Sequence, residues 1–494
     1  MRFTIVLAWR NILRHKGKSL AIGVILTLGT VIMTLGNAVI SGFENGLSKH
    51  FTDDFCGDLL LISPEQEDHA VLFPPMGRNV EPIGNFLEVK PLLTEHTELV
   101  QAFLPAASGL SFVLDDRGNI VAQTLLGVNY EDYVQMFPDT IHLISGVFPE
   151  SGENGVLIST QNREKLLRRS GIMAVPKNAN EKYENAKSEL VFLGLGDKNS
   201  SYDILSPVRG IFEFNGLNAI LGKFNLIDIE SFRESMGYFS AYAQTLELSA
   251  EEVFLLENDT IGLEGLLNEA FEEQVVDDFG LGAGSLKVKK PKLKQIDSNA
   301  GVFNEIFIKL TEGISLQKGQ LELELLLKNN AIDLKVITWK EAIGSYWQLA
   351  YLMRIFLLSM VSLVFLLAIL IIINTLTIAA FERTVEIATM RAIGAQKSLI
   401  GLLFFMEPVL LAVGFGGIGI FLGILISESL AWLEISSTNP FLQVFFGGDV
   451  FRPQVTFKSV LWGVAELAIV TVVTVTYPVF FARKIRPVLA LARQ

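Results

Sequence analysis

Residues 353–391 read MRIFLLSMVSLVFLLAILIIINTLTIAAFERTVEIATMR, and this stretch decides the fold of the chain. Its first part, residues 355–374, is an apolar run of about the 20 residues that a helix needs to cross a hydrocarbon core of roughly 30 Å. The run continues without Gly or Pro into residues 375–391, which are amphipathic and charged. We therefore predict one continuous helix that joins a membrane to an aqueous surface and can carry displacement between them.

The composition indicates an integral membrane protein. Half of the 494 residues are apolar and the mean hydropathy is +0.41, with the apolar residues gathered in a few long runs. The net charge of −13 argues against a nucleic-acid partner. The single cysteine, Cys56, excludes an intramolecular disulfide and any zinc cluster built on cysteines.

Four apolar segments are long enough to span a membrane: residues 20–41, 346–381, 399–428 and 457–482. A cleavable signal peptide is the alternative for the first segment, but its apolar run is too long and no Ala-x-Ala site follows. Residues 1–19 place basic side chains opposite Trp9 and aliphatic side chains. This pattern favours an amphipathic helix that lies in the membrane interface and contacts lipid.

Arginine and lysine gather in residues 1–19, 382–398 and 483–494, which the positive-inside rule assigns to the cytosol. Residues 42–345 and the short loop 429–456 then lie together on the other side. The predicted fold class is an integral membrane α-helical protein with four transmembrane helices and both termini in the cytosol. A large extracytoplasmic mixed α+β domain separates helices 1 and 2.

Residues 42–345 are too long for a loop and large enough for one or two domains with their own core. Strand-like runs alternate there with helix-like ones, which predicts the mixed α+β fold. The predicted strands are residues 59–62, 110–114, 120–128, 155–158, 190–193, 208–214, 225–229 and 306–310. The predicted helices are residues 161–169, 230–236 and 317–328, and residues 176–187 and 280–295 are predicted mobile loops.

Small and hydroxyl-bearing residues recur along one face of the first span at alternating steps of four and three. They are Gly23, Thr27, Thr30, Thr34 and Asn37. Such a face lets another helix approach closely and form hydrogen bonds across the contact. Two interpretations stay open: packing within one subunit, or a seam toward a second subunit or a substrate.

No catalytic centre is predicted. Gly17-Lys18-Ser19 lacks the first glycine and the preceding strand of a phosphate-binding loop. The five histidines are scattered without ligand spacing, which argues against a metal site. Glu407 and Glu466 lie within the third and fourth spans. Each is either part of a proton relay or a hydrogen-bonded packing residue.

The charged extension of the second span, residues 382–398, carries Val385, Met390 and Ile393 among its charged residues. It ends at Gly394, which allows a left-handed backbone conformation. A short amphipathic helix at the cytosolic surface is suited to docking into the groove of a partner.

Residues 381–395, FERTVEIATMRAIGA, closely resemble the coupling-helix motif of FtsX-like permeases, the class that includes MacB and the lipoprotein-releasing LolC and LolE. Residues 8–14, AWRNILR, resemble the N-terminal motif of this family, and residues 477–493 resemble its C-terminus. The order of one span, a large domain and three spans also matches. The resemblance is strong at both ends of the chain and weak in the middle.

The resemblance implies a subunit without an ATPase site or cofactor of its own, served by a cytosolic ABC-type ATPase dimer that would hold ATP and magnesium. A second permease subunit, identical or different, would complete a dimer in the bacterial cytoplasmic membrane, with the large domain in the periplasm. The residues that would contact the ATPase are Glu382, Arg383, Glu386, Met390, Arg391 and Gly394.

Three functions remain open at this stage. A permease of the MacB and LolCE mechanotransmission type would couple ATP hydrolysis to extracytoplasmic handling of a lipoprotein or another amphipathic cargo. An FtsX-like regulatory transducer would instead gate a cell-wall hydrolase without transport. A membrane enzyme would turn over a small substrate without any ATPase partner.

Overall fold

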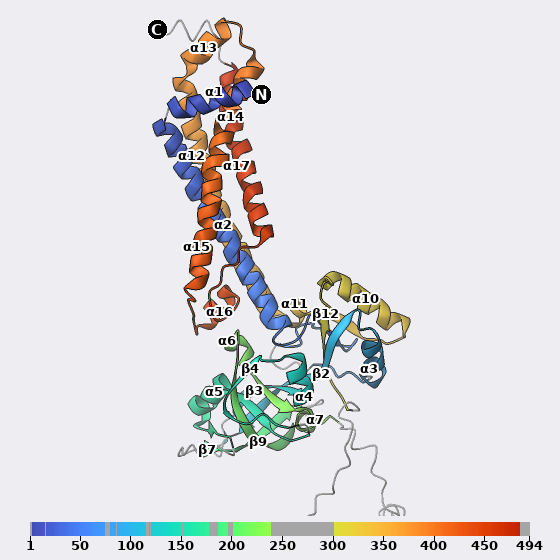
Figure 1. Cartoon of the computed structure of the whole chain (residues 1–494). Helices are drawn as coiled ribbons and strands as arrows, with labels where there is room; N and C mark the ends of the chain where they lie inside the picture. Colours follow the sequence, from blue (N-terminus) through green and yellow to red (C-terminus); the bar gives the residue numbers. More distant parts are fainter. Residues whose placement is uncertain are drawn as a thin grey trace, which may run out of the picture.

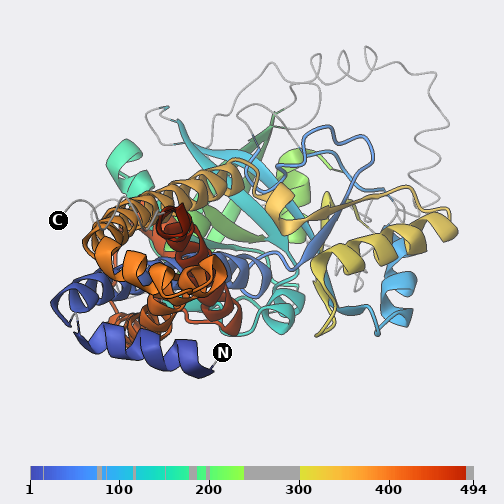
Figure 2. The same cartoon turned by 90° about the horizontal axis from the view of Figure 1, so that it is seen from above.

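The computed structural model describes residues 2–14, 16–74, 80–84, 86–114, 118, 120–150, 152–176, 186–195, 201–238 and 301–484. The predicted loop 280–295 and most of the segments 176–187 and 483–494 fall outside these residues. The molecule is elongated, with a bundle of long helices at one end and an α+β domain at the other (Figure 1). Seen from above, the bundle stands over one side of the α+β domain (Figure 2).

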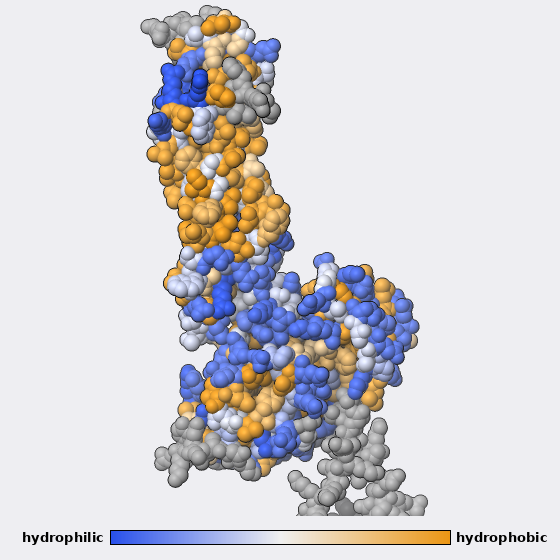
Figure 3. Space-filling view, viewed as in Figure 1, coloured by the Kyte–Doolittle hydropathy of each residue, from blue (hydrophilic) through white to orange (hydrophobic). Residues whose placement is uncertain are grey.

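Four helical segments of the described chain are long and apolar enough to span a membrane. The first lies in α2 (Lys16–Thr52), the second is α12 (Ser345–Glu382) and the fourth is α17 (Phe457–Lys484). The third begins as α14 (Lys397–Leu411) and continues through a π-helical turn (Ala412–Gly416) into α15 (Gly417–Trp432). Figure 3 shows an apolar belt around the bundle with polar residues at both ends, as in a multi-pass membrane protein.

The first helix extends well beyond the predicted span, residues 20–41. α2 has 37 residues, or about 55 Å of helix at 1.5 Å per residue. Its last turns bury Phe43, Leu47 and Phe51 in the core of the α+β domain. The apolar face of the helix thus exchanges lipid and neighbouring helices for the interior of a folded domain. α2 therefore joins the bundle to the α+β domain without a flexible linker.

The predicted continuous helix over residues 353–391 is wrong at one point. α12 ends at Glu382 and α13 (Thr384–Ala392) begins at Thr384. Arg383 between them has φ −93° and ψ 15°, outside the helical range. The sequence contains no helix breaker here, and the bend turns the Arg383 side chain inward to a partner on another helix.

A ten-stranded sheet is the framework of the α+β domain in the described chain, in the order β12-β1-β11-β2-β3-β10-β5-β9-β4. Its strands are β1 (Leu59–Ile62), β2 (Val100–Leu114), β3 (Ile120–Val128), β4 (Ile141–Gly146), β5 (Val156–Ser159), β8 (Glu189–Leu195), β9 (Ser201–Phe214), β10 (Phe224–Asp228), β11 (Glu305–Leu310) and β12 (Lys335–Thr338). Because β8 pairs with both β2 and β9, six of these strands close into a ring. Three of the other strands, β11, β1 and β12, extend from the other half of β2, and the fourth, β4, pairs with β9.

Helices cover this sheet and connect it to the bundle. Those of the α+β domain are α3 (Phe86–Glu95), α4 (Tyr130–Met136), α5 (Thr160–Ser170), α6 (Asn218–Leu221), α7 (Ile229–Met236), α10 (Leu316–Asn329) and α11 (Trp339–Ala342). α7 places Phe232 in the core, against Gly109 and Gly127 of the sheet. A short pair of strands, β6 (Met173–Ala174) and β7 (Ala186–Lys187), lies apart from the main sheet.

Two further helices lie at the ends of the bundle. α1 (Arg2–Arg14) crosses the end that is farthest from the α+β domain and packs against α14 (Figure 1). α16 (Pro440–Phe446) lies in the loop between the third and fourth spans, at the end next to the α+β domain.

Candidate functional site

α13 lies at the end of the bundle opposite the α+β domain, close to α1 (Figure 1). Its inner face is held by Ile387 and Ala388, which are fully buried, and Ile387 packs against Ile400 of α14. Gly394, in the turn that follows, has φ 104°, a backbone conformation that favours glycine. α13 is thus a short helix clamped on one side and open on the other.

The open side of α13 mixes apolar and charged side chains. Ile393 is 83% exposed and Val385 is 40% exposed, so apolar surface is present among the charged residues. Five of the six predicted contact residues are exposed or partly exposed here: Glu382, Glu386, Met390, Arg391 and Gly394.

Glu386 already has one partner within the chain. Its Oε1 lies 3.5 Å from a guanidinium nitrogen of Arg14 in α1, and both side chains are largely exposed. Exposed ion pairs contribute only about 0–1 kcal/mol, because water and salt screen them. Glu386 can therefore exchange Arg14 for a basic residue of a docking partner at little cost.

Arg383 departs from the predicted docking surface, because its side chain points into the bundle. Its two terminal nitrogens donate to both carboxylate oxygens of Glu407, at 2.7 and 3.1 Å. Both side chains are nearly buried, with 11% and 14% exposed. Of the two interpretations of Glu407, this ion pair favours a bonded packing residue over a relay, since Arg383 reaches it from outside α14.

The small-residue face of the first span packs against the third span of the same chain. The Oγ1 of Thr27 donates to the carbonyl oxygen of Phe415 at 2.9 Å. The ring of Phe415 also fills the space beside Gly23, where a Cβ would lie 2.6 Å from it. Two of the five predicted seam residues thus meet the π-helical turn of their own chain.

The same contact continues along α15. A Cβ added at Gly419 would overlap the Oγ1 of Thr30, and one added at Gly423 would lie 2.7 Å from the Cβ of Thr34. The two helices therefore approach as closely as backbones allow, which small residues permit in membranes. Contact within the subunit accounts for this face without a second chain.

Asn37, the last residue of that face, reaches the fourth span. Its Nδ2 donates to the Oε2 of Glu466 at 3.1 Å. The hydrogen bond gives this carboxyl group a partner inside the bundle. The geometry thus favours a packing role for Glu466 over a relay.

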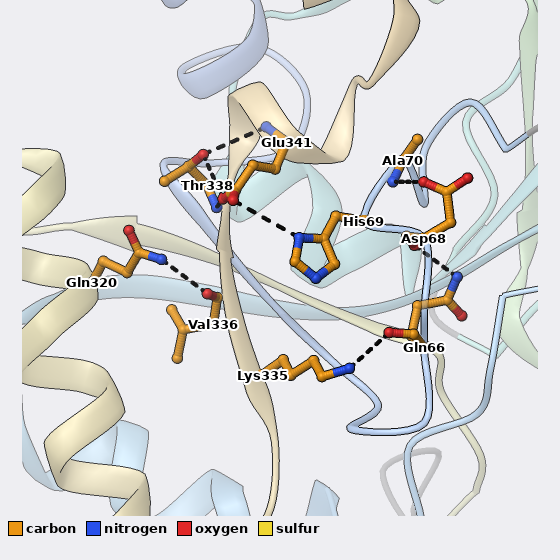
Figure 4. A network of polar contacts seen from close by, with 9 residues as sticks. All are labelled: Gln66, Asp68, His69, Ala70, Gln320, Lys335, Val336, Thr338 and Glu341. Atoms are coloured by element: carbon orange, nitrogen blue, oxygen red, sulfur yellow. Dashed lines mark hydrogen bonds and ion pairs between the residues drawn. The ribbon is translucent and has the colours of Figure 1, made fainter.

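A network of polar contacts holds α11, which precedes α12, to the rest of the α+β domain (Figure 4). Thr338 and Glu341 cap α11 reciprocally, and the Glu341 carboxylate lies 3.8 Å from Nδ1 of His69. Lys335 Nζ donates to the carbonyl oxygen of Gln66 at 2.8 Å, so strand β12 is held by the same loop as α11. α12 therefore begins directly after an element that is fixed to the sheet.

The loop between the third and fourth spans makes a second connection to the α+β domain. Gln443 of α16 is buried, and its Oε1 accepts a hydrogen bond from the backbone N–H of Ala219 at 2.9 Å. Asp449 accepts backbone hydrogen bonds from Leu217 and Asn218 at the start of α6. This loop, predicted only as a short connection, is thus a joint between the bundle and the sheet.

Glu305 is a buried acid in the α+β domain that the sequence analysis did not single out. Its Oε1 accepts a hydrogen bond from Ser108 at 2.6 Å, and its Oε2 has no partner among the described residues. Burial raises the pKa of Glu305 from 4.5 to about 7, and the Ser108 hydrogen bond opposes this rise. The folded domain therefore keeps the proton up to about pH 7, whereas the unfolded chain releases it near pH 4.5.

Glu305→Gln should flatten the pH dependence of the stability of the domain. In the native chain, Glu305 reduces stability progressively as the pH rises from about 4.5 to about 7, by at most about 1.4 kcal/mol per pH unit. The variant should equal the native chain near pH 4 and exceed it by about 2 kcal/mol at pH 8, less than the full difference because the amide N–H lacks an acceptor. Melting of the full chain in detergent between pH 4 and pH 8 tests this, and parallel curves for the two proteins would contradict it.

The described residues contain no cluster of side chains suited to a metal, and their cysteine is buried. In that part of the chain, no three His, Cys, Asp or Glu side chains gather in a group that could hold a metal. Cys56 is fully buried, and this burial raises the pKa of its thiol.

Comparisons with known proteins support the resemblance found in the sequence. The family described as "FtsX-like permease C-terminal" matches residues 358–487. An uncharacterized ABC transporter permease of Methanocaldococcus jannaschii is 24% identical over 230 residues, which cover 46% of this chain and 56% of that protein. The ABC transporter permease YtrF of Bacillus subtilis is 36% identical over 100 residues, covering 20% of this chain and 21% of YtrF.

The lipoprotein-releasing system transmembrane protein LolC of Haemophilus influenzae is 26% identical over 160 residues, covering 32% of this chain and 38% of LolC. The chain thus spans about half or less of the length of these curated relatives. Among solved structures, the extracellular domain of the noncanonic ABC-type transporter YknZ aligns with 57% of this chain and 98% of that domain, at 8% identity and a TM-score of 0.27, too low to indicate a shared fold. The predicted resemblance to FtsX-like ABC transporter permeases is confirmed by the family match and the curated relatives.

Proposed function

We propose that this FtsX-like permease chain is the membrane subunit of an ABC transporter of the MacB and LolCE mechanotransmission type. The observation that carries the proposal is the position of α13. It presents an open surface of apolar and charged residues at the end of the bundle opposite the α+β domain (Figure 1). A separate ATPase that binds this surface can move helices that reach the α+β domain, such as α2, whose 37 residues make a helix about 55 Å long.

The proposed orientation puts α13 and both termini in the cytosol. Basic residues of α1 and its flank, including the exposed Arg10, Arg14 and Lys16, lie at the α13 end of the bundle. Trp9 is exposed on α1, which suits a helix in contact with lipid at the interface. The α+β domain and the loop 429–456 would then lie in the periplasm of a bacterium.

The energy source would belong to the partner. A cytosolic ABC ATPase dimer would bind ATP and magnesium, and its closure would push on the segment 382–398. This chain would supply no catalytic group and no cofactor site. A second permease subunit, identical or different, would pair with it in the membrane.

The work would be done by the α+β domain. α2, α12 and α16 each end in contacts with this domain, so relative movement of the spans would reshape it from three points. The name of the relative LolC refers to lipoprotein release. A lipoprotein or another amphipathic molecule is therefore the cargo that we propose.

Two cysteine variants test the proposed topology. Ser398→Cys lies in the first turn of α14 and Glu434→Cys lies beyond α15, and both positions are exposed. The native Cys56 can stay, because it is fully buried and burial raises the pKa of its thiol. A membrane-impermeant maleimide added to intact spheroplasts should label only Glu434→Cys, and Ser398→Cys should react only after permeabilisation.

Purification of the tagged full chain from native membranes tests the partner and the cargo. We expect an ABC ATPase to co-purify and acylated proteins to be enriched. Labelling of both cysteines from one side, or the absence of any ATPase, would overturn the proposal. Enrichment of a cell-wall hydrolase without acylated proteins would favour a regulatory transducer instead.

A further inference from the structure

The ion pair of Arg383 and Glu407 lies where all four spans meet. It adjoins a cavity of about 20 Å³ near the α13 end of the bundle. α2, α12, α14 and α17 each contribute lining residues, which are Ser19, Ile22, Leu376, Ala379, Leu411 and Val475, together with the ion pair and its neighbours. A change at this point therefore reaches every span at once.

Two of the helices around this cavity contain a proline that lines it. Pro408 follows Glu407 in α14, and Pro478 lies inside α17, and both line the cavity. A proline inside a helix removes one backbone hydrogen bond, so the helix bends more easily there. α14 also continues into a π-helical turn at Ala412–Gly416, another place where helices deform.

α13 is joined to both α12 and α14. Its connection to α12 passes through one residue, Arg383, whose backbone is not helical. Arg383 in turn donates two hydrogen bonds to Glu407 of α14, and Ile387 of α13 makes a buried contact with Ile400 of α14. A push on α13 would therefore act on α14 directly, through the ion pair and this buried contact.

We propose that the ion pair of Arg383 and Glu407 is the contact that transfers movement of α13 to the third span. This inference rests on the proposed function and names the span that would carry the movement. The second span, α12, is then the fixed reference, and α14 with α15 is the moving element. The movement reaches the α+β domain through α16, where Gln443 binds the backbone of Ala219.

The chemistry of the pair suits this role. Two parallel charge-assisted hydrogen bonds fix both the distance and the angle between the guanidinium and the carboxylate. Separating them would leave two nearly buried charges without partners, which is strongly unfavourable. The pair is therefore expected to stay closed while the third span moves.

The test follows the far ends of two spans in the complete complex. Spin labels are placed on Tyr351→Cys of α12 and Leu433→Cys beyond α15, both of which are exposed in the native chain. The full chain with its co-purified ATPase is reconstituted in nanodiscs, and the distance between the labels is measured without nucleotide and after trapping with ATP and vanadate. We expect the native chain to populate a second distance in the trapped state.

Arg383→Gln and Glu407→Gln should each reduce the trapped population at least about fivefold, the lower end of typical coupling between sites, while the ATPase still co-purifies. The charge-swapped chain, Arg383→Glu with Glu407→Arg, should recover a large part of it. Arg168→Gln breaks an exposed ion pair with Glu164 in the α+β domain and is the matched control, with no expected effect.

An unchanged distance shift in the single variants, with the ATPase bound, would refute this role of the ion pair and leave the proposed function intact. The absence of both ATPase and shift in the native chain would instead refute the proposed function. If the single variants do not give a monodisperse complex, the charge-swapped chain and Arg383→Lys decide. The proposal is contradicted if Arg383→Lys shows the full distance shift and the charge-swapped chain shows none. It is supported if the charge-swapped chain shows the shift and Arg383→Lys shows none.

Discussion

Ile393→Asp is expected to weaken binding of the ATPase strongly while leaving the chain folded. Ile393 is 83% exposed next to Gly394, so its substitution removes no internal contact of consequence. In a complex it would fill an apolar pocket, and an aspartate there would bury an unpaired charge. Central apolar anchors of interfaces cost about 2–4 kcal/mol when lost, so we expect the affinity to fall roughly a hundredfold.

The measurement is the amount of ATPase that co-purifies with the tagged chain, followed by titration of the ATPase onto the reconstituted permease. Leu433→Asp is the matched control, because it places the same charge on an exposed leucine at the opposite end of the bundle. Glu386→Lys should weaken binding less, since the side chain is solvated and already shares Arg14. Equal affinity of Ile393→Asp and the native chain would show that the docking surface lies elsewhere.

Local pattern was enough to predict most secondary structure. Residues 120–128, IVAQTLLGV, are rich in apolar and β-branched side chains, and β3 has these same bounds, because such side chains favour strands. The second span, predicted as residues 346–381, coincides within a residue at each end with α12 (Ser345–Glu382), since its length and hydropathy leave one structure possible in a membrane. The exposed, amphipathic character of α13 also followed from its spacing of apolar residues.

Contacts between distant segments could not be predicted. The inward turn of Arg383 depends on Glu407, 24 residues away on a different helix, and nothing in the local sequence indicates which charge finds which partner. The continuation of the first helix beyond residue 41 was not predicted for the same reason. Phe43, Leu47 and Phe51 continue an apolar helical face, and only the tertiary fold decides that this face meets a protein core.

The joint at α16 was missed because Gln443 and Ala219 carry no motif. One is an ordinary glutamine and the other contributes only its backbone N–H. A signal was present in Asn439-Pro440, which caps and starts a helix in a loop that was otherwise predicted as a simple connection. Backbone hydrogen bonds of this kind leave almost no trace in the sequence.

Gly419→Leu should separate the first and third spans and destabilise the bundle strongly. A Cβ at position 419 would overlap the Oγ1 of Thr30 and lie 2.6 Å from the carbonyl oxygen of Thr27. Neither group can move aside, because Thr30 is buried and the carbonyl is part of the α2 backbone. α15 must therefore shift away along the whole seam, and we expect a loss of about 3 kcal/mol, the upper part of the range for overpacked sites.

Gly417→Leu is a matched control on the same helix, because a Cβ there would meet no atom within 4 Å. Melting of both variants in detergent should lower the transition of Gly419→Leu by roughly 6 °C or more, at about 2 °C per kcal/mol, and leave Gly417→Leu near the native value. If the seam instead belonged to a contact between subunits, Gly419→Leu would dissociate a dimer without changing the melting of the monomer. The comparison therefore separates the two interpretations that the spacing of Gly23, Thr27, Thr30, Thr34 and Asn37 left open.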